Sequence, residues 1–416
     1  MAEQNNHIYD TVVIGGGAAG FFGAITIVER HRSASVLILE KTSQVLSKVK
    51  VSGGGRCNVT HQELPLKTFA KHYPRGEREL RNVLQEFSSS DVQKWFLEKG
   101  VPLKTEADGR MFPESNTSQT IIDCFTKEVQ KKNIVVKTSC AVINVRKEHD
   151  IFHLTTSEGE IQAKYLLACT GGSQNSNHYN WLKELAQSIT PLYPSLFTFN
   201  AADHVLKNLA GVALPHCRIR IRNSKLQEEG PLLITHWGLS GPAILKLSAW
   251  GAVELAERQY SFDALIAWDR SFTEASLKEK IHALTKEHGK KKIHNTSIEP
   301  VPKRLWELLV LLCDINEEQT WNNISQKKIN KLIEHLMSYP VVVKGKTTFK
   351  EEFVTAGGVS LKDIHLQSME SVNIPGLHFA GEILNIDGIT GGFNFQAAWS
   401  TAFIAAKNIV TSLNKK

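Results

Sequence analysis

The chain has little that would suit a secreted, membrane-spanning or metal-stabilised protein. No apolar run approaches the ~18 residues that a transmembrane helix needs, and residues 1–10 are polar, so we expect neither a membrane span nor a secretory signal. The six cysteines are scattered without a C-x-x-C pair, which excludes an obvious zinc or disulfide framework. We therefore predict no metal site and a reducing, cytoplasmic location.

Length and composition describe a globular chain of more than one domain. With 416 residues the chain exceeds an ordinary single domain, so we expect about two or three. Hydrophobic residues make up 42% and charged residues 22% of the chain, which is typical of soluble proteins. The formal net charge of +7 is compatible with a polyanionic partner but does not by itself indicate one.

A glycine-rich motif close to the start of the chain predicts a phosphate-binding turn. Residues 12–14 are Val-Val-Ile, as a buried parallel strand requires. Gly15 would permit the tight turn, Gly17 would let the backbone approach a phosphate, and Gly20 would let the next helix pack closely. The helix that begins near Ala18 would offer free N–H groups and a partial positive charge to a pyrophosphate.

An acidic residue follows at the spacing expected for a dinucleotide. A second apolar strand, 36–39, ends at Glu40, which lies 20 residues beyond Gly20. A carboxylate at this place accepts a hydrogen bond from a ribose hydroxyl. A glycine motif alone is weak evidence, but a strand, a helix and an acid in register predict a dinucleotide-binding fold.

A second glycine-rich motif lies near the end of the chain. It runs through Gly381 and Glu382 and continues in 387–394, Asp-Gly-Ile-Thr-Gly-Gly-Phe-Asn. We predict that a helix begins within this run and ends near Ile409. If the dinucleotide carries a flavin, the helix N-terminus would point at the N1/C2 carbonyl edge of the flavin ring, where negative charge develops on reduction. Glu382 or Asp387 would hold the ribityl chain, although an ordinary glycine-rich helix start is the alternative. A cofactor held by both ends of the chain indicates FAD and a redox enzyme.

Two glycine-bearing segments between these motifs complete the predicted cofactor site. Residues 52–58, Ser-Gly-Gly-Gly-Arg-Cys-Asn, leave backbone amides bare, and Arg56 and Asn58 add directional donors. A buried strand ends at Thr170 and two glycines, where the carboxyl edge of a sheet meets its ligand. Arg56 and Lys48 are predicted to contact flavin or phosphate rather than to perform chemistry. The predicted cofactor contacts are Gly15, Gly17, Ala18, Ala19, Gly20, Glu40, Lys41, Lys48, Ser52, Gly53, Arg56, Cys57, Asn58, Val142, Thr170, Gly171, Gly172, Gly381, Glu382, Asp387, Gly391, Gly392, Phe393 and Asn394.

Hydrophobic periodicity predicts an interrupted domain. In the first part of the chain, the predicted elements are helices at 77–99 and 116–132, a hairpin at 100–112, and strands at 134–145 and 151–156. Further along, the predicted elements are strands at 196–200, 215–222, 231–235 and 260–268, followed by helices at 274–288, 302–313 and 325–338. We therefore predict a flavin domain made of 1–195 and 345–416, into which 196–344 is inserted.

Two residues are candidates for a catalytic proton donor. Cys57 would sit beside the isoalloxazine ring and deliver a proton, or it is a small residue that shapes the glycine-rich loop. No basic neighbour is evident in the sequence, so an activated thiolate is not predicted. His236 is the best general-acid candidate outside the flavin core. Its loop also suits a structural role, with Ser240 as a helix cap and Pro242 at the first helical position.

Alternation within the predicted insert places basic residues on one strand face. Residues 216–222 read His-Cys-Arg-Ile-Arg-Ile-Arg, and a strand would turn every second side chain the same way. The side chains that would share this face are His216, Arg218, Arg220 and Arg222. The face is either a solvated surface or a phosphate-contacting surface for RNA, and RNA binding of this kind would be salt-sensitive. No RNA-binding sequence signature is present.

Taken together, these motifs resemble the HI0933-like (YhiN/BaiN-type) family of FAD-dependent oxidoreductases over nearly the whole chain. The segments that carry the resemblance are 52–58, 109–113 (Gly-Arg-Met-Phe-Pro), 235–242 (Thr-His-Trp-Gly-Leu-Ser-Gly-Pro), 355–360 (Thr-Ala-Gly-Gly-Val-Ser) and the closing glycine and Asn-Phe-Gln run. Their order and spacing are more specific than any one of them. The chain departs from the family pattern at Asn385, where an acid is common, and in 173–180, which lacks the usual glycine-rich turn.

The resemblance implies an α/β fold, namely a two-dinucleotide-binding (Rossmann-like) FAD domain with an inserted β-barrel and helical domain. It also implies an enzyme in which NAD(P)H passes hydride through FAD to an electron-poor C=C bond. No second G-x-G-x-x-G is visible, so the nicotinamide would bind transiently at the flavin face. Family activities include reduction of uridine in ribosomal RNA and of unsaturated steroid-like acids, and some members carry an amine-oxidase label.

The basic residues of the insert make ribosomal RNA the first substrate to test. A small-molecule ene-reductase and an amine oxidase remain alternatives. A hypothesis of another class is a flavin-holding scaffold or redox sensor with Cys57 beside the flavin. The sequence leaves open the substrate, the choice of NADH or NADPH and the oligomeric state.

Overall fold

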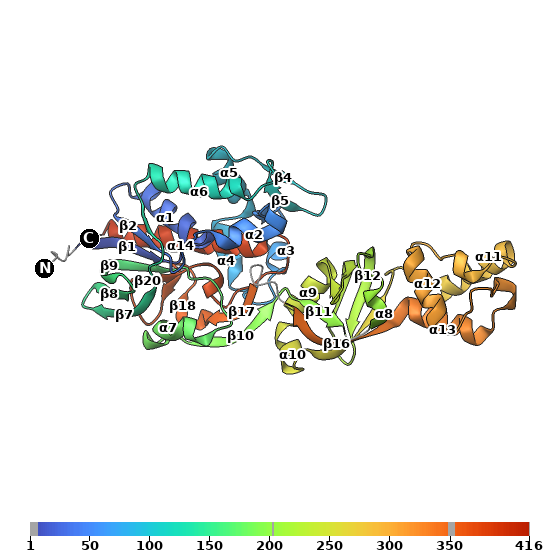
Figure 1. The fold of residues 1–416 in the computed structure, drawn as a ribbon. Helices are drawn as coiled ribbons and strands as arrows, with labels where there is room; N and C mark the ends of the chain where they lie inside the picture. The colour runs from blue at the N-terminus through green and yellow to red at the C-terminus, as the bar shows by residue number, and fades with distance from the viewer. Residues whose placement is uncertain (1–6, 202–203, 348–353, 416) are drawn as a thin grey trace. The chain divides into compact units, whose positions relative to one another are not determined.

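The computed structural model describes residues 7–201, 204–347 and 354–415 (Figure 1). Contacts within the chain divide it into two compact units. The cofactor unit comprises Met1–Ser195 and Phe349–Lys416, and the barrel unit comprises Leu196–Thr348. Strand β16 (Tyr339–Thr347) belongs to the barrel unit, so the domain boundary that we predicted at 344/345 falls inside this strand.

A mostly parallel sheet forms the centre of the cofactor unit. Val, Ile and Leu side chains fill β2 (Val36–Leu39) and the end of β1 (Ile8–Ile14), which suits strands buried on both faces. β1 pairs in parallel with β2 on one side and with β9 (Gly159–Ala168) on the other. Beyond them lie β6 (Val135–Lys137), next to β2, and β20 (Leu377–Phe379), next to the end of β9. The carboxyl ends of β1, β2 and β9 therefore share one edge of the sheet.

Two long helices from opposite ends of the chain pack together in this unit. α1 (Ala18–Arg30) consists mainly of apolar and small residues, most of them buried, and α14 (Phe393–Leu413) packs along it (Figure 1). Gly23 lets α1 lie close to β9, because a Cβ there would lie 2.6 Å from a methyl carbon of Leu167, and it faces Ala402 of α14 at an ordinary contact distance of 3.7 Å. The first and last segments of the chain therefore share one core.

The predicted helix at 77–99 is in fact two helices. α4 (Leu80–Glu86) and α5 (Ser89–Glu98) are separate elements. Between them, the Asp91 N–H donates to the Ser88 side chain at 3.3 Å, and the Ser88 N–H donates to the Asp91 carboxylate at 2.7 Å. This capping box starts a new helix although the apolar periodicity continues across it, and the prediction of one helix was wrong for that reason.

Further strands and helices complete the cofactor unit. The remaining strands are β3 (Thr60–His61), β4 (Leu103–Thr105), β5 (Arg110–Pro113), β7 (Val142–Glu148), β8 (Ile151–Thr156), β10 (Ile189–Ser195), β17 (Val354–Val359), β18 (Ile364–His365) and β19 (Glu370–Ser371). The remaining α-helices are α2 (Ser47–Gly55), α3 (Leu66–Ala70), α6 (Gln119–Lys131) and α7 (Asn180–Glu184). β10 and β17 form a separate antiparallel ribbon in which Ser195 stands opposite Val354.

The barrel unit is built on a closed barrel with the strand order β11-β14-β13-β12-β15-β16. Besides β16, the strands are β11 (Thr198–Ala201), β12 (Ala213–Ile221), β13 (Gln227–Ile234), β14 (Gly238–Ser240) and β15 (Ser261–Ala267). Along β12, the buried Cys217, Ile219 and Ile221 alternate with more exposed side chains, which confirms the predicted alternation. The barrel and the Rossmann-like α/β sheet that the family resemblance implied are both confirmed.

Helices complete the barrel unit. They are α8 (His204–Lys207), α9 (Pro242–Trp250), α10 (Ala252–Glu257), α11 (Glu274–His288), α12 (Lys303–Leu312) and α13 (Gln326–Ser338). Pro242 stands at the first position of α9 as predicted, but the N-cap is Gly241 and not Ser240. Gly241 has a φ of 101°, and a Cβ on it would lie 2.8 Å from the Pro231 carbonyl oxygen, so the turn requires glycine. Among the described residues, no helix is both long enough and apolar enough to cross a membrane.

Candidate cofactor site

The turn between β1 and α1 forms a cradle of backbone atoms. Gly15 has a φ of 114°, and a Cβ on it would lie 2.3 Å from the carbonyl oxygen of Cys169. A Cβ on Gly20 would lie 2.0 Å from the carbonyl oxygen of Gly15. Gly17 differs, because within the described residues no neighbouring group comes within 4 Å of the place where its Cβ would stand. Gly15 and Gly20 are required for packing, whereas Gly17 leaves room for a bound group beside the helix N-terminus.

Three other segments meet at this turn. The Gly16 N–H donates to Oε2 of Glu40, at the end of β2, at 2.9 Å. The Leu46 N–H, just before α2, donates to the Gly16 carbonyl at 2.8 Å. Thr170, after β9, is so close that a Cβ on Gly15 would lie 3.0 Å from its Cα. The carboxyl edge of the sheet and the start of α2 thus form one site. The hydrogen bond between Glu40 and a ribose hydroxyl stays a prediction.

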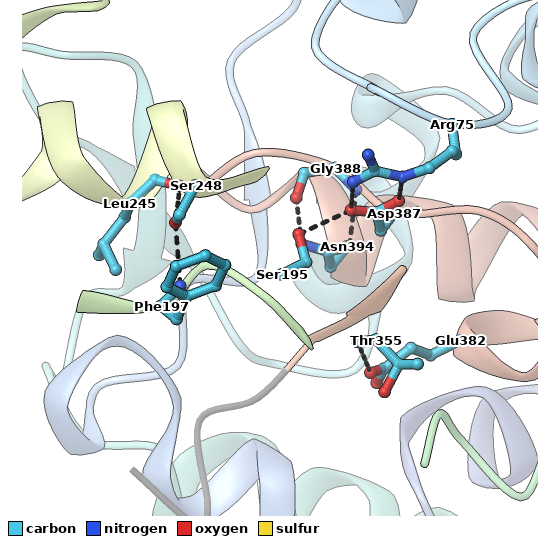
Figure 2. Close-up of polar contacts among 10 residues, drawn as sticks. All are labelled: Arg75, Ser195, Phe197, Leu245, Ser248, Thr355, Glu382, Asp387, Gly388 and Asn394. Carbon is cyan, nitrogen blue, oxygen red and sulfur yellow. Dashed lines mark hydrogen bonds and ion pairs between the residues drawn. The ribbon is translucent and has the colours of Figure 1, made fainter. Parts of the chain in front are cut away.

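Glu382 connects the C-terminal motif to this site. Its Oε2 accepts a hydrogen bond from the Lys48 ammonium at 2.6 Å. Its Oε1 accepts one from the Thr355 N–H at 2.9 Å (Figure 2). A Cβ on Gly172 would lie 2.7 Å from the same Oε1, so the turn after β9 passes directly beside this carboxylate. The structure therefore brings together Lys48, Gly172 and Glu382, which we predicted at the cofactor from distant parts of the sequence.

Asp387 is held on both carboxylate oxygens by other side chains. The Arg75 guanidinium donates to both oxygens, and the Ser195 hydroxyl donates to Oδ2 at 2.7 Å (Figure 2). Asp387 is fully buried; burial raises its pKa, while the hydrogen bonds from Arg75 and Ser195 lower it. These contacts fix the loop that precedes α14, and a direct contact of Asp387 with the ribityl chain stays a prediction.

The loop before α14 closes on itself. The Asn394 carboxamide accepts the Gly388 N–H and donates to the Gly388 carbonyl, both at 2.8 Å (Figure 2). Gly392, the N-cap of α14, has a φ of 92°, and a Cβ on it would lie 2.4 Å from the Thr60 carbonyl oxygen. Asn58, with its amide oriented to match its neighbours, accepts the Gly392 N–H at 2.9 Å. α14 thus begins at the predicted motif, and its first turn carries no acid that would repel an anion.

The glycine run in α2 interrupts the helix and exposes its backbone. Gly53 and Gly54 have φ values of 58° and 67°, and nothing among the described residues approaches a Cβ on Gly54 within 4 Å. Arg56, which follows, pairs with Glu106 at 2.6 Å, and its guanidinium carbon lies 4.0 Å from the centre of the Phe112 ring. These interactions hold the glycine run against the β4–β5 hairpin, and a contact of Arg56 with the cofactor stays a prediction.

The two predicted proton donors belong to different units. Cys57 is fully buried with a φ of 60°, and burial raises the pKa of its thiol to about 12. At neutral pH this thiol is therefore protonated and is a weak acid. His236 is exposed in a tight turn of the barrel unit, where the Thr235 N–H donates to the Gly238 carbonyl at 2.8 Å. A catalytic role for either residue stays a prediction.

The other predicted contacts lie around the same edge of the sheet. Lys41 is exposed directly after β2, and Val142 is half-buried at the start of β7. Ala18 and Ala19 form the first turn of α1. A Cβ on Gly381 would lie 2.9 Å from the Cβ of Ala19, so Gly381 lets the C-terminal motif pack on that turn.

Sequence reasoning missed the group around Phe393, the first residue of α14. The His72 ring stacks on the Phe393 ring with 4.3 Å between centroids, and the His61 ring lies on it at 4.9 Å. The Tyr73 hydroxyl donates to the Phe393 carbonyl at 2.8 Å. These residues are more than three hundred positions from Phe393 in the sequence. The signal that the sequence offered was the group of histidine and aromatic side chains in 61–73.

The residues present fit a bound dinucleotide. Gly17, Gly54 and Gly171 each have open space where a Cβ would stand. Backbone amides at such positions can approach a phosphate or a ring closely. Because the segments that carry Gly17 and Gly171 meet at one turn, with a helix N-terminus and the ammonium of Lys48 nearby, the site offers the donors that a pyrophosphate requires.

Comparisons with known proteins place the chain in a family. The family of the HI0933-like protein Rossmann domain matches residues 9–408. The chain is 28% identical to the ribosomal RNA dihydrouridine synthase of Escherichia coli (strain K12), over 97% of this chain and 98% of that one. It is 24% identical to the 3-dehydro-bile acid delta(4,6)-reductase of Clostridium scindens, over 95% of this chain and 97% of that one.

Solved structures share the fold. They include the 3-ketosteroid delta1-dehydrogenase of Sterolibacterium denitrificans, with a TM-score of 0.53 and 11% identity over 97% of this chain and 100% of that one. They also include the 3-ketosteroid-delta4-(5alpha)-dehydrogenase of Rhodococcus jostii RHA1, with a TM-score of 0.51 and 13% identity over 98% of both chains. The family match extends from β1 into α14, and the chain belongs to the HI0933-like family of FAD-dependent oxidoreductases.

Proposed function

We propose that this protein uses FAD and a reduced nicotinamide to reduce the C=C bond of uridine in ribosomal RNA to give dihydrouridine. The observation that carries the proposal is the similarity to a ribosomal RNA dihydrouridine synthase along 97% of the chain. The phosphate cradle at Gly17 and the exposed basic face of β12 support it. We also propose that the protein acts in the cytoplasm.

The chemistry that bound FAD supplies is hydride transfer, from the reduced nicotinamide to one carbon of an electron-poor C=C bond, while a proton completes the other carbon. In this proposal, the N-terminus of α1 and Gly17 bind the pyrophosphate, and Glu40 accepts a ribose hydroxyl. The first turn of α14 stabilises negative charge that develops nearby. In this proposal, the proton comes from the Cys57 thiol, the His236 side chain or water.

The outer face of β12 is the proposed RNA contact. Arg220 on β12 and Arg222 directly after its end are exposed, and Arg218 is half-buried. Arg218 pairs with Glu229 at 2.7 Å, and Arg222 pairs with Asp263 at 3.3 Å, so part of the positive charge is already neutralised. Arg220 makes no ion pair with any residue that the structure describes, which makes its guanidinium the one best placed to contact a phosphate.

A small-molecule substrate is the second candidate. It is favoured by the similarity to a bile-acid reductase over 95% of the chain. In that case the substrate is a small conjugated enone, and the arginines of β12 have no part in turnover. A redox sensor based on Cys57 is less favoured, because a fully buried thiol with a pKa of about 12 reacts slowly with oxidants.

The test begins with the visible spectrum of the purified protein without oxygen, before and after NADPH or NADH is added. The proposal expects an oxidised flavin that bleaches with one of them. Unmodified ribosomal RNA is then added, and its nucleosides are analysed by mass spectrometry for a uridine that has gained two hydrogens. If the flavin bleaches and the RNA nucleosides stay unchanged, but a conjugated steroid acid is reduced, the result would support the second candidate instead. A flavin that neither nicotinamide reduces, together with peroxide formation from an amine, would indicate an oxidase.

A further inference from the structure

The segment that follows β9 places a histidine beside the candidate cofactor site. His178 lies in the short 3-10 helix Ser176–Tyr179, and its Nε2 is 3.0 Å from Oγ1 of Thr170. Thr170 in turn adjoins the phosphate cradle, because a Cβ on Gly15 would lie 3.0 Å from the Thr170 Cα. A single threonine therefore separates the imidazole of His178 from the turn that holds Gly17.

The charged groups around His178 favour its neutral form. Burial lowers its pKa most strongly, and the nearby ammonium groups of Lys41 and Lys48 lower it further, while hydrogen bonding to the backbone of Gly171 and Thr170 raises it. Lys41 follows β2 and Lys48 lies on α2, so both come from segments that border the cradle.

Other titratable groups lie close to His178 and to the two lysines. Tyr179 packs edge-on against the imidazole, with 5.1 Å between ring centroids, and its hydroxyl accepts the Ser173 N–H at 3.1 Å. The carboxylate of Glu382 is already engaged by Lys48 and by the Thr355 N–H. Glu382 pairs with Lys48, and the carboxylate of Glu40 accepts the Gly16 N–H of the cradle, so acidic groups also border the site. A bound diphosphate would add further negative charge at the cradle and would favour the imidazolium form of His178.

We propose that His178 is a positioning residue that couples the binding of the FAD diphosphate to the uptake of a proton. The inference rests on the proposed function in that FAD is taken as the cofactor. Negative charge at the cradle offsets the field of Lys41 and Lys48 and so favours the imidazolium. The protonated ring donates from Nε2 to the Thr170 hydroxyl and holds the turn after β9 against the cofactor.

Proton uptake predicts the direction in which FAD affinity depends on pH. The complex binds the proton more tightly than the free protein does, so the dissociation constant for FAD rises as pH rises through the window between the two pKa values. That window begins below the ordinary histidine pKa of about 6.5, because the pKa of His178 is lowered in the free protein. Each pKa unit between the two states changes the dissociation constant by about tenfold.

The experiment measures FAD binding to the full-length protein across pH. The dissociation constant is followed by flavin fluorescence between about pH 5.5 and 8.5, and titration calorimetry in two buffers of different ionisation enthalpy counts the protons taken up. His178→Asn keeps an amide donor near Thr170 but cannot take up a proton. His282→Asn, at an exposed position on α11 in the barrel unit, is the matched control.

We expect the wild type and His282→Asn to bind FAD several-fold more weakly at the alkaline end and to take up a fraction of a proton. His178→Asn should give a flat pH profile and no uptake. A wild type without pH dependence, or a His178→Asn variant with the wild-type slope, would overturn the inference while FAD binding itself persists. A wild type that binds no FAD at any pH would overturn the proposed function instead.

A second variant covers the case in which His178→Asn does not fold. Thr170→Val removes the oxygen that His178 contacts and keeps the shape of the side chain. It should shrink the pH slope of FAD binding and leave the thermal unfolding midpoint of the ligand-free protein close to that of the wild type. An unchanged slope in this variant would contradict the inference.

Discussion

Arg75 and Asp387 lie 312 residues apart in the chain and form a two-point ion pair in which the carboxylate is completely buried. Arg75→Met leaves this carboxylate without its charged partner, and among the described side chains the Ser195 hydroxyl alone still donates to it. Breaking a buried pair in this way costs about 3–5 kcal/mol. We expect a loss of that size in the free energy of unfolding, measured by urea denaturation.

A surface ion pair provides the control for this substitution. Arg146 and Glu148 pair at 2.9 Å while both side chains are more than half exposed. Arg146→Met should change the free energy of unfolding by less than about 1 kcal/mol, because solvent screens such pairs. If Arg75→Met and Arg146→Met had equal effects, the loop before α14 would not depend on the buried pair.

Two glycines of the cradle should respond to the same substitution in opposite ways. A Cβ on Gly17 meets no neighbouring group within 4 Å among the described residues, so Gly17→Ala should fold with an unchanged unfolding midpoint. The added methyl group occupies the space proposed for the pyrophosphate, so FAD affinity should fall on the order of tenfold, or about 1.4 kcal/mol. The flavin content of the purified variant and an FAD titration measure this loss.

Gly20→Ala is the contrasting case. Its Cβ would lie 2.0 Å from the Gly15 carbonyl oxygen, so α1 must move away from the turn. We expect destabilisation of about 1–3 kcal/mol, as in other overpacked sites. Normal FAD binding by Gly17→Ala would contradict the proposed position of the pyrophosphate, and a stable Gly20→Ala would contradict the packing described for α1.

The thiol of Cys57 should remain unreactive in the native protein. All six cysteines are buried, and the pKa of Cys57 is raised to about 12, so the thiolate is almost absent between pH 6 and 9. Iodoacetamide at about pH 8 should label Cys57 only after unfolding, as mass spectrometry of the digested protein would show. The rate of substrate reduction should show no thiol titration in this pH range. Rapid labelling of Cys57 in the folded protein would mean that the loop opens to solvent.

Charge reversal on β12 tests the RNA contact. Arg220→Glu should weaken binding of ribosomal RNA several-fold at low salt and should reduce the salt dependence by about one phosphate contact. FAD content should stay unchanged because Arg220 belongs to the barrel unit. Arg146→Glu makes the same change in net charge on β7 of the cofactor unit and serves as the control. Equal RNA affinities of the two variants in a filter-binding assay would exclude a specific role for this face.

The sequence predicted the elements that depend on local patterns. The predicted helix at 274–288 has the same bounds as α11, and the predicted strand at 260–268 contains β15. Backbone sterics also made the packing roles of Gly15 and Gly20 predictable, because a Cβ at either position would meet a carbonyl oxygen. The phosphate contact of Gly17 stays a prediction.

Long-range partners could not be predicted in this way. No local pattern connects Arg75 with Asp387, or His72 with Phe393, because these contacts exist only once the two ends of the chain have packed together. The environment of His178 is of the same kind, since its neighbours come from three separate segments. The hydrogen bonds between the Asn394 carboxamide and Gly388 of the same loop were likewise not predicted, and a contact of Asn394 with the cofactor stays a prediction.

The β10–β17 ribbon has a consequence for how such a protein arises and can be rebuilt. Because Ser195 and Val354 stand opposite each other, the chain leaves the cofactor unit and returns to it at neighbouring positions. Closely spaced entry and exit points are where one coding sequence can be spliced into another without disturbing the host. We therefore expect that the coding segment for the barrel unit can be exchanged among relatives while the cofactor unit keeps its fold.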